Sequence, residues 1–463
     1  MKKTLVSLAT ASLIASTAMA ADKGIDIVTT GQAVLYYETQ DDNGKNTVGG
    51  VKKDRSSMFD ERSSQANVGV QLNLDADLKN NFTFGSQLSY LGTAGLEKNV
   101  VSGVKQDAGL STSVWTTDQL ALTKIFVAKK IANTTVKIGR QELPKSLSPF
   151  AYSEGWNVFK NTFDAVLAVN TDIPDTTLVG AYVSGGTGMG IQSTSDLTSK
   201  VGVPIGVPGV PAGDLTADVD GTAYMLTVQN KSIPMTTLTL SYYDLARVGN
   251  RLTANDETIA ANVIWADAMV AGKDLPMGIR FGLQGGQIST DSTLKNVVGV
   301  GDVDMENTTA FGVKVGAKPI DALTLCAAYT SVSGDDDKVN VAVKNVGTGI
   351  KSPLYTQMIY NQDAISLDAN TFMLKAAYNT GDYGTVIAQG AMTSAGKSNL
   401  MNENRNKETD YNEFDLIYKV KAAGVQYFAA YIYRSWSEKT VAGSTLEGHD
   451  SDNRLRVWAR YNF

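Results

Sequence analysis

The last ten residues of the chain, RLRVWARYNF at positions 454–463, indicate the fold. Apolar side chains occupy every second position from Leu455 to Phe463. The alternate positions hold Arg454, Arg456, Trp458, Arg460 and Asn462. A strand of a soluble β-sandwich rarely turns three arginines toward a packed core, because burying an unpaired charge is costly. A strand with one face in lipid and the other in water accepts them readily. The segment therefore predicts a transmembrane β-strand.

The same alternation recurs along the chain from Asp26 onward, in segments of about ten residues. After the first twenty residues no run of eighteen apolar residues exists, which excludes a helical membrane protein. A closed barrel is then the remaining way across a bilayer, because every backbone polar group must find a partner within the chain. We predict about eighteen strands, near residues 26–37, 64–77, 80–91, 118–130, 134–142, 161–171, 175–184, 221–231, 235–246, 257–268, 276–288, 308–318, 321–331, 370–379, 382–392, 411–420, 423–434 and 453–463.

The connections between these segments alternate between short and long. The short ones lie at or near 79–80, 132–133, 172–174, 232–234, 319–320, 380–381 and 422–423. Polar, glycine-rich or acidic stretches lie between them. Short periplasmic turns and long external loops are typical of a bacterial outer-membrane barrel, whereas a soluble sandwich or propeller has no reason to separate its loop lengths in this way. An even strand number also places both termini on the periplasmic side, and eighteen strands leave an open lumen.

The N-terminus carries a targeting signal. Lys2 and Lys3 precede a mostly apolar run over residues 5–15, and Ala18-Met19-Ala20 provides a signal-peptidase site. This run is too short to span a bilayer, so cleavage after Ala20 is favoured over a retained N-terminal anchor. We therefore expect a signal peptide at 1–20, a single barrel domain at 21–463, and location in the outer membrane.

Composition limits the chemistry. The net charge is −6, or −6 − 2 = −8 without the two signal-peptide lysines, which argues against a nucleic-acid partner. A single cysteine, Cys326, cannot form an internal disulfide. A single histidine, His449, argues against a zinc site and against histidine-based catalysis. We expect no metal, no cofactor and no enzymatic activity.

One motif is specific enough to point to a family. Gly-Arg-Gln-Glu-Leu-Pro at 139–144 closes a predicted strand and leads into the third long loop, toward Phe150 and Trp156. The segment resembles the OprD-like and major-outer-membrane-protein porins of Gram-negative bacteria. In that group a Gly-Arg/Lys-Gln-Glu/Gln-Leu/Ile segment precedes the loop that folds into the pore. The resemblance covers about residues 134–183 and the terminal Arg-Tyr-Asn-Phe, and it implies a homotrimer.

This resemblance makes residues 143–160 the pore constriction, with charged members Lys145, Glu154 and Lys160, and with Arg140 at the mouth of the loop. The strand pattern adds candidate lumen-lining charges of both signs: Lys137, Arg280, Lys314, Lys375, Arg434, Arg454, Arg456, Arg460, Asp75, Asp164, Glu413 and Asp415. Facing charges of opposite sign set a transverse field that disfavours apolar solutes. The alternative is that these charges only solvate the wall. The terminal Phe463 resembles the signal read by the barrel-assembly machinery.

Three other features resemble sites. Residues 185–190 mimic a phosphate-binding loop, but no Gly-Lys-Ser/Thr and no helix pattern follow them. The acidic runs 335–337 and 41–42 contain carboxylates that calcium prefers, although a solvated acidic loop is the favoured interpretation. The pair Glu413 and Asp415 also has the residue types of a glycosidase, but pore lining is the simpler interpretation.

The predicted function is a porin for passive diffusion of ions and small hydrophilic solutes. Its expected partners are the lipid bilayer, lipopolysaccharide and the barrel-assembly machinery. A substrate-selective channel of the same fold, for example for carboxylates, is the first alternative, because the last strand carries inward arginines. A barrel enzyme or an adhesin that uses the loops is the second alternative.

Overall fold

The computed structural model describes residues 25–42, 47–48, 51–52, 57–96, 99–106, 118–155, 157–191, 197–202, 215–219, 222–249, 258–272, 274–291, 293–297, 301–401, 407–440 and 448–463. The predicted signal peptide at 1–20 and Trp156 lie outside these residues.

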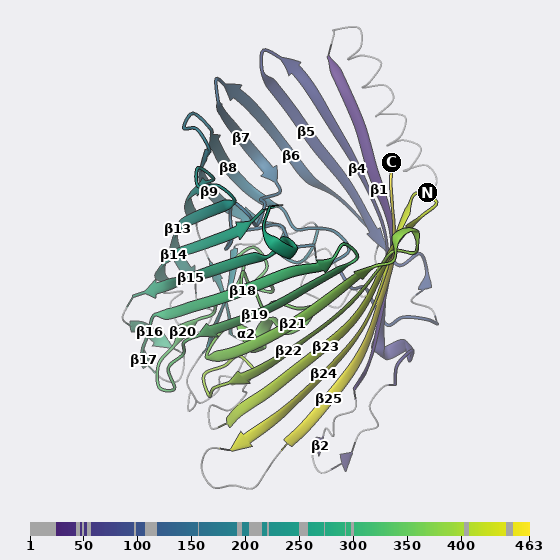
Figure 1. Ribbon diagram of the computed structural model, residues 1–463, viewed down its shortest axis with the longest axis vertical. Helices are drawn as coiled ribbons and strands as arrows, with labels where there is room; N and C mark the ends of the chain where they lie inside the picture. Colours follow the sequence, from purple (N-terminus) through teal and green to yellow (C-terminus); the bar gives the residue numbers. More distant parts are fainter. Residues whose placement is uncertain are drawn as a thin grey trace.

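Eighteen strands form one antiparallel sheet that closes on itself. They are β1 (Asp26–Asp42), β4 (Ser64–Lys79), β5 (Phe82–Gly92), β6 (Gln119–Ile131), β7 (Thr134–Gln141), β8 (Phe163–Asn170), β9 (Thr176–Gly186), β12 (Ala223–Asn230), β13 (Thr236–Gly249), β14 (Thr258–Ala271), β15 (Arg280–Thr290), β18 (Thr308–Ile320), β19 (Leu323–Val332), β21 (Ala369–Asn379), β22 (Thr385–Ala395), β23 (Lys407–Ala422), β24 (Val425–Thr440) and β25 (Gly448–Asn462). Each strand pairs with its neighbours in chain order, and β1 pairs with both β4 and β25 (Figure 1). The predicted 18-stranded up-and-down barrel is confirmed.

The long connections contain short elements that the sequence pattern did not predict. They are β2 (Thr47–Val48), β3 (Val51–Lys52), β10 (Leu197–Gly202), β11 (Leu215–Val219), β16 (Thr293–Val297), β17 (Gly301–Asp304), β20 (Asn340–Val341), η1 (Glu61–Ser63) and α2 (Gln362–Ile365), while η3 (Pro276–Gly278) and η4 (Gly381–Tyr383) lie at short turns. Strands β23, β24 and β25 also extend beyond the predicted ends on the long-loop side. Polar residues there continue the backbone ladder without apolar alternation, so the pattern gives no signal. In the described part of the chain, no helix has both the length and the apolar character needed to cross a membrane.

Two short turns share one design. The segments 170–177 and 230–237 both contain Ile-Pro between an asparagine and two consecutive threonines. The Asn170 side chain accepts a hydrogen bond from the backbone N–H of Asp172 at 3.1 Å, and Asn230 accepts the same bond from Ser232 at 3.1 Å. Such Asx turns reverse the chain within a few residues, and they explain why this rim of the barrel has tight connections.

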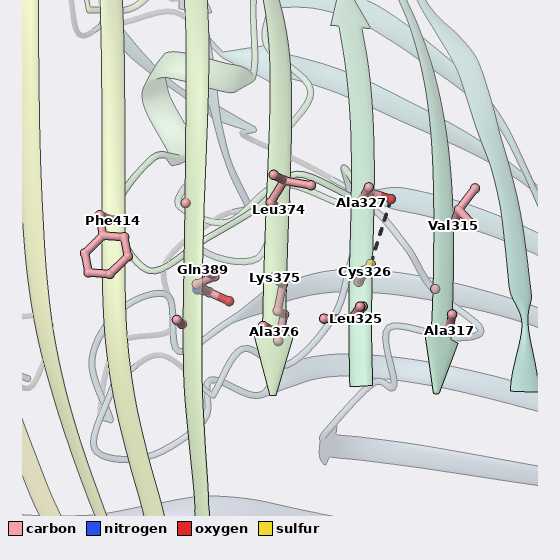
Figure 2. A pocket seen from close by; sticks show the side chains of 13 residues that line it. Val315, Ala317, Leu325, Cys326, Ala327, Leu374, Lys375, Ala376, Gln389 and Phe414 are labelled. Carbon is pink, nitrogen blue, oxygen red and sulfur yellow. Dashed lines mark hydrogen bonds between the residues drawn. The ribbon is translucent and has the colours of Figure 1, made fainter. Parts of the chain in front are cut away.

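The outer face of the sheet is apolar. Leu374 and Phe414 are 54 % and 45 % exposed on the face that their strands turn away from the lumen. Figure 2 shows part of this face across β18 to β23, where Val315, Leu374 and Phe414 border a shallow hollow of about 610 Å³. The residues between them, such as Lys375, take the inner face because strand side chains alternate. This arrangement is the one a lipid-facing barrel requires.

Two of the long connections fold inward against the barrel wall. Loop L3 (residues 142–162) connects β7 to β8, and loop L7 (residues 333–368) connects β19 to β21. The two loops contact each other, since the backbone N–H of Val346 donates to the carbonyl oxygen of Phe150 at 2.8 Å. The Phe150 ring packs on Trp265 of β14 at 5.2 Å between centroids. The predicted infolding of the third loop is confirmed, whereas the entry of L7 was not predicted.

Candidate functional site

Four arginines of β24 and β25 project into the lumen. Arg456 is buried and donates from Nε to Glu38 Oε2 of β1 at 2.9 Å. Arg434 forms a two-point ion pair with Asp452, with Nε 2.7 Å from Oδ1, and Arg454 Nη2 lies 3.1 Å from the same carboxylate. These side chains alternate with outward residues such as Tyr431 and Tyr433. We call Arg434, Arg454, Arg456 and Arg460 the arginine row. Paired carboxylates make buried guanidinium groups tolerable in a wall of this kind.

Two carboxylates of β23, Glu413 and Asp415, belong to the same wall, and Glu413 contacts L7. Glu413 accepts hydrogen bonds from the backbone N–H of Tyr360 at 2.8 Å and from the hydroxyl of Tyr411 at 2.7 Å. Asp415 accepts from Gln389 Nε2 at 2.7 Å. Both carboxylates point inward, as their strand positions predict. In this arrangement Glu413 holds L7 against the barrel wall.

Glu38 is a central residue that the sequence analysis missed. It accepts hydrogen bonds from Arg456, from Lys105 Nζ at 2.7 Å and from the hydroxyls of Tyr36 and Tyr360. Position 38 shares the inward face of β1 with Gln32 and Tyr36, so the alternation contained this signal. Lys105 belongs to the second long connection, and its approach to β1 has no counterpart in the strand pattern.

A polar cavity of about 280 Å³ lies between L3 and strands β1 to β6. We call it the L3 cavity. Its lining includes Lys124, Lys160, Arg460 and Glu142, so three cations face one anion. Lys160 Nζ lies 3.0 Å from Glu142 Oε2, and Lys124 pairs with the other oxygen. Burial disfavours the charged form of Glu142, but the two ammonium groups outweigh it and hold the pKa below its ordinary value.

Amide side chains line the wall of the L3 cavity: Gln32, Gln71, Asn73 and Gln87. Gln32 Nε2 donates to Gln71 Oε1 at 2.5 Å, Gln71 Nε2 donates to Gln87 Oε1 at 3.1 Å, and Gln87 Nε2 donates to Asn73 Oδ1 at 2.7 Å. Within the same lining, Arg460 Nη2 donates to the backbone carbonyl of Val158 in L3 at 3.0 Å. The cavity therefore combines excess positive charge with hydrogen-bonding groups that suit hydroxylated solutes.

A second cavity of about 660 Å³ lies on the other side of L3, against β12 to β18. It contains Lys145, Lys231, Lys314, Asp267 and Tyr355. The Tyr355 hydroxyl donates to Asp267 Oδ2 at 2.5 Å, and Lys314 Nζ lies 4.0 Å from the Tyr355 ring centre. Burial lowers the pKa of Lys145, in L3, to about 8. This lysine cavity has the same excess of cations as the L3 cavity.

Glu154 joins L3 to L7 instead of facing open space. It is 2 % exposed. Its Oε1 atom accepts from Asn345 Nδ2 at 2.6 Å, from Thr348 Oγ1 at 2.6 Å and from the backbone N–H of Lys351 at 3.1 Å. Burial raises the pKa of Glu154 despite these hydrogen bonds. Of the four residues predicted for the constriction, Lys160 lines the L3 cavity, Lys145 lines the lysine cavity, and Glu154 clasps the two loops together.

Most other predicted lumen charges occupy inward positions. Lys137 Nζ lies 3.6 Å from the centre of the Phe126 ring, which faces the lumen. Arg280 and Lys375 alternate with the outward residues Phe281 and Leu374. Asp75 also takes an inward position, since it shares the inner face of β4 with Gln71 and Asn73.

Arg140 and Asp164 differ from the expectation of a lumen position. The pair is two-pronged, with Arg140 Nε 2.8 Å from Asp164 Oδ1 and Nη2 2.9 Å from Oδ2. The β7–β8 register places Arg140 opposite Asp164 and Ile138 opposite Val166, and both apolar side chains are exposed on the outer face. Since side chains two positions apart share a face, the ion pair also lies on the outer side. Mutual neutralisation makes this position tolerable near the loop rim.

Phe463 closes the ring of strands. Its backbone N–H and carbonyl exchange hydrogen bonds with Gly31 of β1 at 3.0 and 2.7 Å. Its ring lies directly over Gly31, where a Cβ atom would approach Cζ to 2.5 Å. A glycine is therefore required at this position. Elsewhere in the described residues, no group of three or more histidine, cysteine, aspartate or glutamate side chains is placed to hold a metal ion.

No protein-family model matches this sequence, and no curated protein is significantly similar to it. Solved structures are similar to the barrel. Pseudomonas aeruginosa OccK8 (OprE) superposes with a TM-score of 0.63 at 14 % identity, covering 95 % of this chain and 98 % of the other. Acinetobacter baumannii OccAB3 gives 0.61 at 13 % identity over 94 % and 99 %. P. aeruginosa OccK2 (OpdF) in complex with glucuronate gives 0.56 at 14 % identity over 94 % and 98 %. This chain therefore has the fold of the OprD/Occ outer-membrane porins.

Proposed function

We propose that this chain forms a water-filled channel in the outer membrane, through which ions and small hydrophilic solutes diffuse passively. The proposal rests mainly on one observation: the barrel is closed, apolar on its outer face, and lined on its inner face by charged and amide side chains. A cation excess in both lumenal cavities favours anionic solutes over cationic ones. The chain is not an enzyme in this proposal, and transport needs neither a cofactor nor an energy source.

Small carboxylates are the anions that the L3 cavity fits best. Lys124, Lys160 and Arg460 offer charge-assisted hydrogen bonds to a carboxylate. The adjoining amides offer donors and acceptors to the hydroxyl groups of a sugar acid. The complex of OccK2 with glucuronate shows such a molecule bound to a protein of the same fold. These points favour passive but carboxylate-selective passage over unselective diffusion, and a channel over an adhesin or enzyme.

The cellular setting is part of the same proposal. Residues 1–20 direct export and are removed, and the barrel-assembly machinery recognises the strand that ends at Phe463. The exposed apolar band, which includes Leu374, then contacts lipid, with lipopolysaccharide in the outer leaflet. Three copies assemble as a homotrimer. The signal-like N-terminus and the alternating last strand support the statements on export and assembly, whereas the homotrimer rests on the resemblance to the porin family alone.

Solute uptake into liposomes tests the proposal. Liposomes that contain the purified chain should take up glucuronate faster than glucose. The double variant Lys160→Gln/Arg460→Gln should lower the glucuronate rate about tenfold, because each lost ion contact of about 1 kcal/mol weakens binding several-fold. Glucose uptake should change little.

The matched control removes a lysine outside the lumen. Lys79→Gln, at a short turn where Lys79 pairs with Asp26, should leave both rates unchanged. Equal glucuronate and glucose uptake in every variant would support unselective diffusion and refute the carboxylate preference. No uptake of either solute would refute the channel itself.

A further inference from the structure

Tyr360 of L7 lies against the arginine row. The centre of its ring is 4.4 Å from Arg454 Cζ, 5.0 Å from Arg456 Cζ and 5.3 Å from Arg434 Cζ. Lys105 Nζ approaches the same ring at 5.6 Å. Each of these distances is within the range of a cation–π interaction. One phenol ring therefore contacts four cations at once.

The hydroxyl group of Tyr360 completes this contact. It donates to Glu38, and Arg456 Nη2 donates to the phenol oxygen at 2.6 Å. Lys105 Nζ lies 3.4 Å from the same oxygen. The side chain is 7 % exposed. Tyr360 thus offers the cations an electron-rich ring face and an oxygen atom. A bound anion would interact with the same cations through its own negatively charged atoms.

The position of Tyr360 is set by both L7 and the barrel. Its backbone N–H is held by Glu413 of β23 at 2.8 Å. Next to it, the carbonyl oxygens of Met358 and Ile359 accept hydrogen bonds from Lys351 Nζ at 3.0 and 2.6 Å. These hydrogen bonds fix the backbone of the loop segment. The Tyr360 side chain, in contrast, can rotate about its own side-chain bonds without moving that backbone. A side-chain movement alone would withdraw the ring from Arg454 and both the ring and the hydroxyl from Arg456.

We propose that Tyr360 is a displaceable cover of the arginine row, and that it determines both the unitary conductance and the anion preference of the channel. With Tyr360 in place, Arg434, Arg454 and Arg456 all have hydrogen-bond partners within the protein. An anionic solute that reaches the row competes with the ring and the hydroxyl, and uncovers an additional anion site above the L3 cavity. The inference rests on the proposed channel function and deepens it.

Single-channel recording in planar bilayers tests this role with Tyr360→Ala and Tyr360→Phe. Loss of the cation–π contacts should raise the anion-to-cation permeability ratio about three- to fivefold in the alanine variant, with a larger unitary conductance. The phenylalanine variant keeps the ring but loses the hydroxyl contacts, so its increase should be smaller. Tyr383→Ala, at an exposed tyrosine of the η4 turn, is the matched control and should resemble the wild type.

Each outcome separates the two proposals. A conducting wild type whose conductance and permeability ratio are unchanged in both Tyr360 variants overturns the cover and leaves the channel intact. A reduced anion preference in Tyr360→Ala also overturns it, because the ring would then be assisting anions. Absence of conductance in the wild type refutes the channel function. If the alanine variant fails to form a heat-modifiable barrel on gels, Tyr360→Leu replaces it, because leucine also removes the aromatic ring and the hydroxyl while it fills more of the space, and an unchanged ratio there overturns the cover.

Discussion

Replacing Glu154 by alanine should weaken the docking of L7 on L3. The substitution removes the acceptor shared by Asn345, Thr348 and the backbone N–H of Lys351. A buried donor left without a partner costs about 1–3 kcal/mol. At the lower end for three donors the sum is about 3 kcal/mol, which shifts the docking equilibrium about a hundredfold. Glu154→Gln keeps an acceptor oxygen, and burial already raises the pKa of Glu154, so losing the charge there costs little.

Limited trypsin digestion measures this equilibrium directly. The Lys351 side chain donates to backbone carbonyls of its own loop at 2.6 and 3.0 Å, so the peptide after it is protected while L7 is docked. When opening is fast relative to cleavage, the cleavage rate follows the open population. We expect cleavage after Lys351 to be about a hundredfold faster in Glu154→Ala and within about fivefold of wild type in Glu154→Gln. Cleavage at the exposed turn residue Lys231 is the internal control. Equal rates after Lys351 in wild type and Glu154→Ala would refute the clasp.

Three further predictions address the lumen, the lipid face and the barrel seam. Burial lowers the pKa of Lys145 to about 8, so its charge is present below that pH and lost above it; the anion preference in reversal-potential measurements should fall as pH rises through about 8, and Lys145→Met should reduce this step without abolishing it, because burial also lowers the pKa of Lys351 to about 8. Leu374→Arg on the outer face should cost about 2–4 kcal/mol in urea titrations in vesicles, whereas the inward Gln389→Arg should cost less, and equal losses would contradict the assigned faces. Gly31→Val should cost about 1–3 kcal/mol, because its Cβ would meet the Phe463 ring, and unchanged thermal stability would argue against that contact.

The strands could be predicted because each repeats a two-residue pattern that lipid and water impose separately on its two faces. The same pattern placed Arg456, Glu413 and Asp415 inward, and the structure has them there. The same pattern places Glu38 inward as well. Glu38 was not predicted as a lumen charge, because no other charged side chain shares the inward positions 32, 34 and 36 of its strand. Arg140 and Asp164 lie on the outer face of their strands. Proximity to L3 misplaced Arg140, and the strand pattern assigned Asp164 to the wrong face.

The loop contacts could not be predicted from periodicity. The side-chain bond from Asn345 to Glu154 joins residues that are 191 positions apart, and neither segment has a regular pattern. Similarly, the contact between Tyr360 and Glu38 joins L7 to the first strand. Such contacts depend on the three-dimensional path of L7, and this path is determined by the contacts of the loop with the folded barrel. The resemblance to a porin family indicated the infolding of L3 but gave no information about L7.

The current through single channels, before and after thiol labelling, tests the central claim most directly. Cys326 lies on the inner face of β19, while its neighbour Leu325 is 41 % exposed on the outer face. Purified wild-type protein in a planar bilayer should give discrete current steps, and a charged, water-soluble thiol reagent should change their size. The variant Cys326→Ala/Leu325→Cys should give the same steps without any response. Absence of steps, or a response only from the cysteine at position 325, would contradict a barrel with water inside and lipid outside.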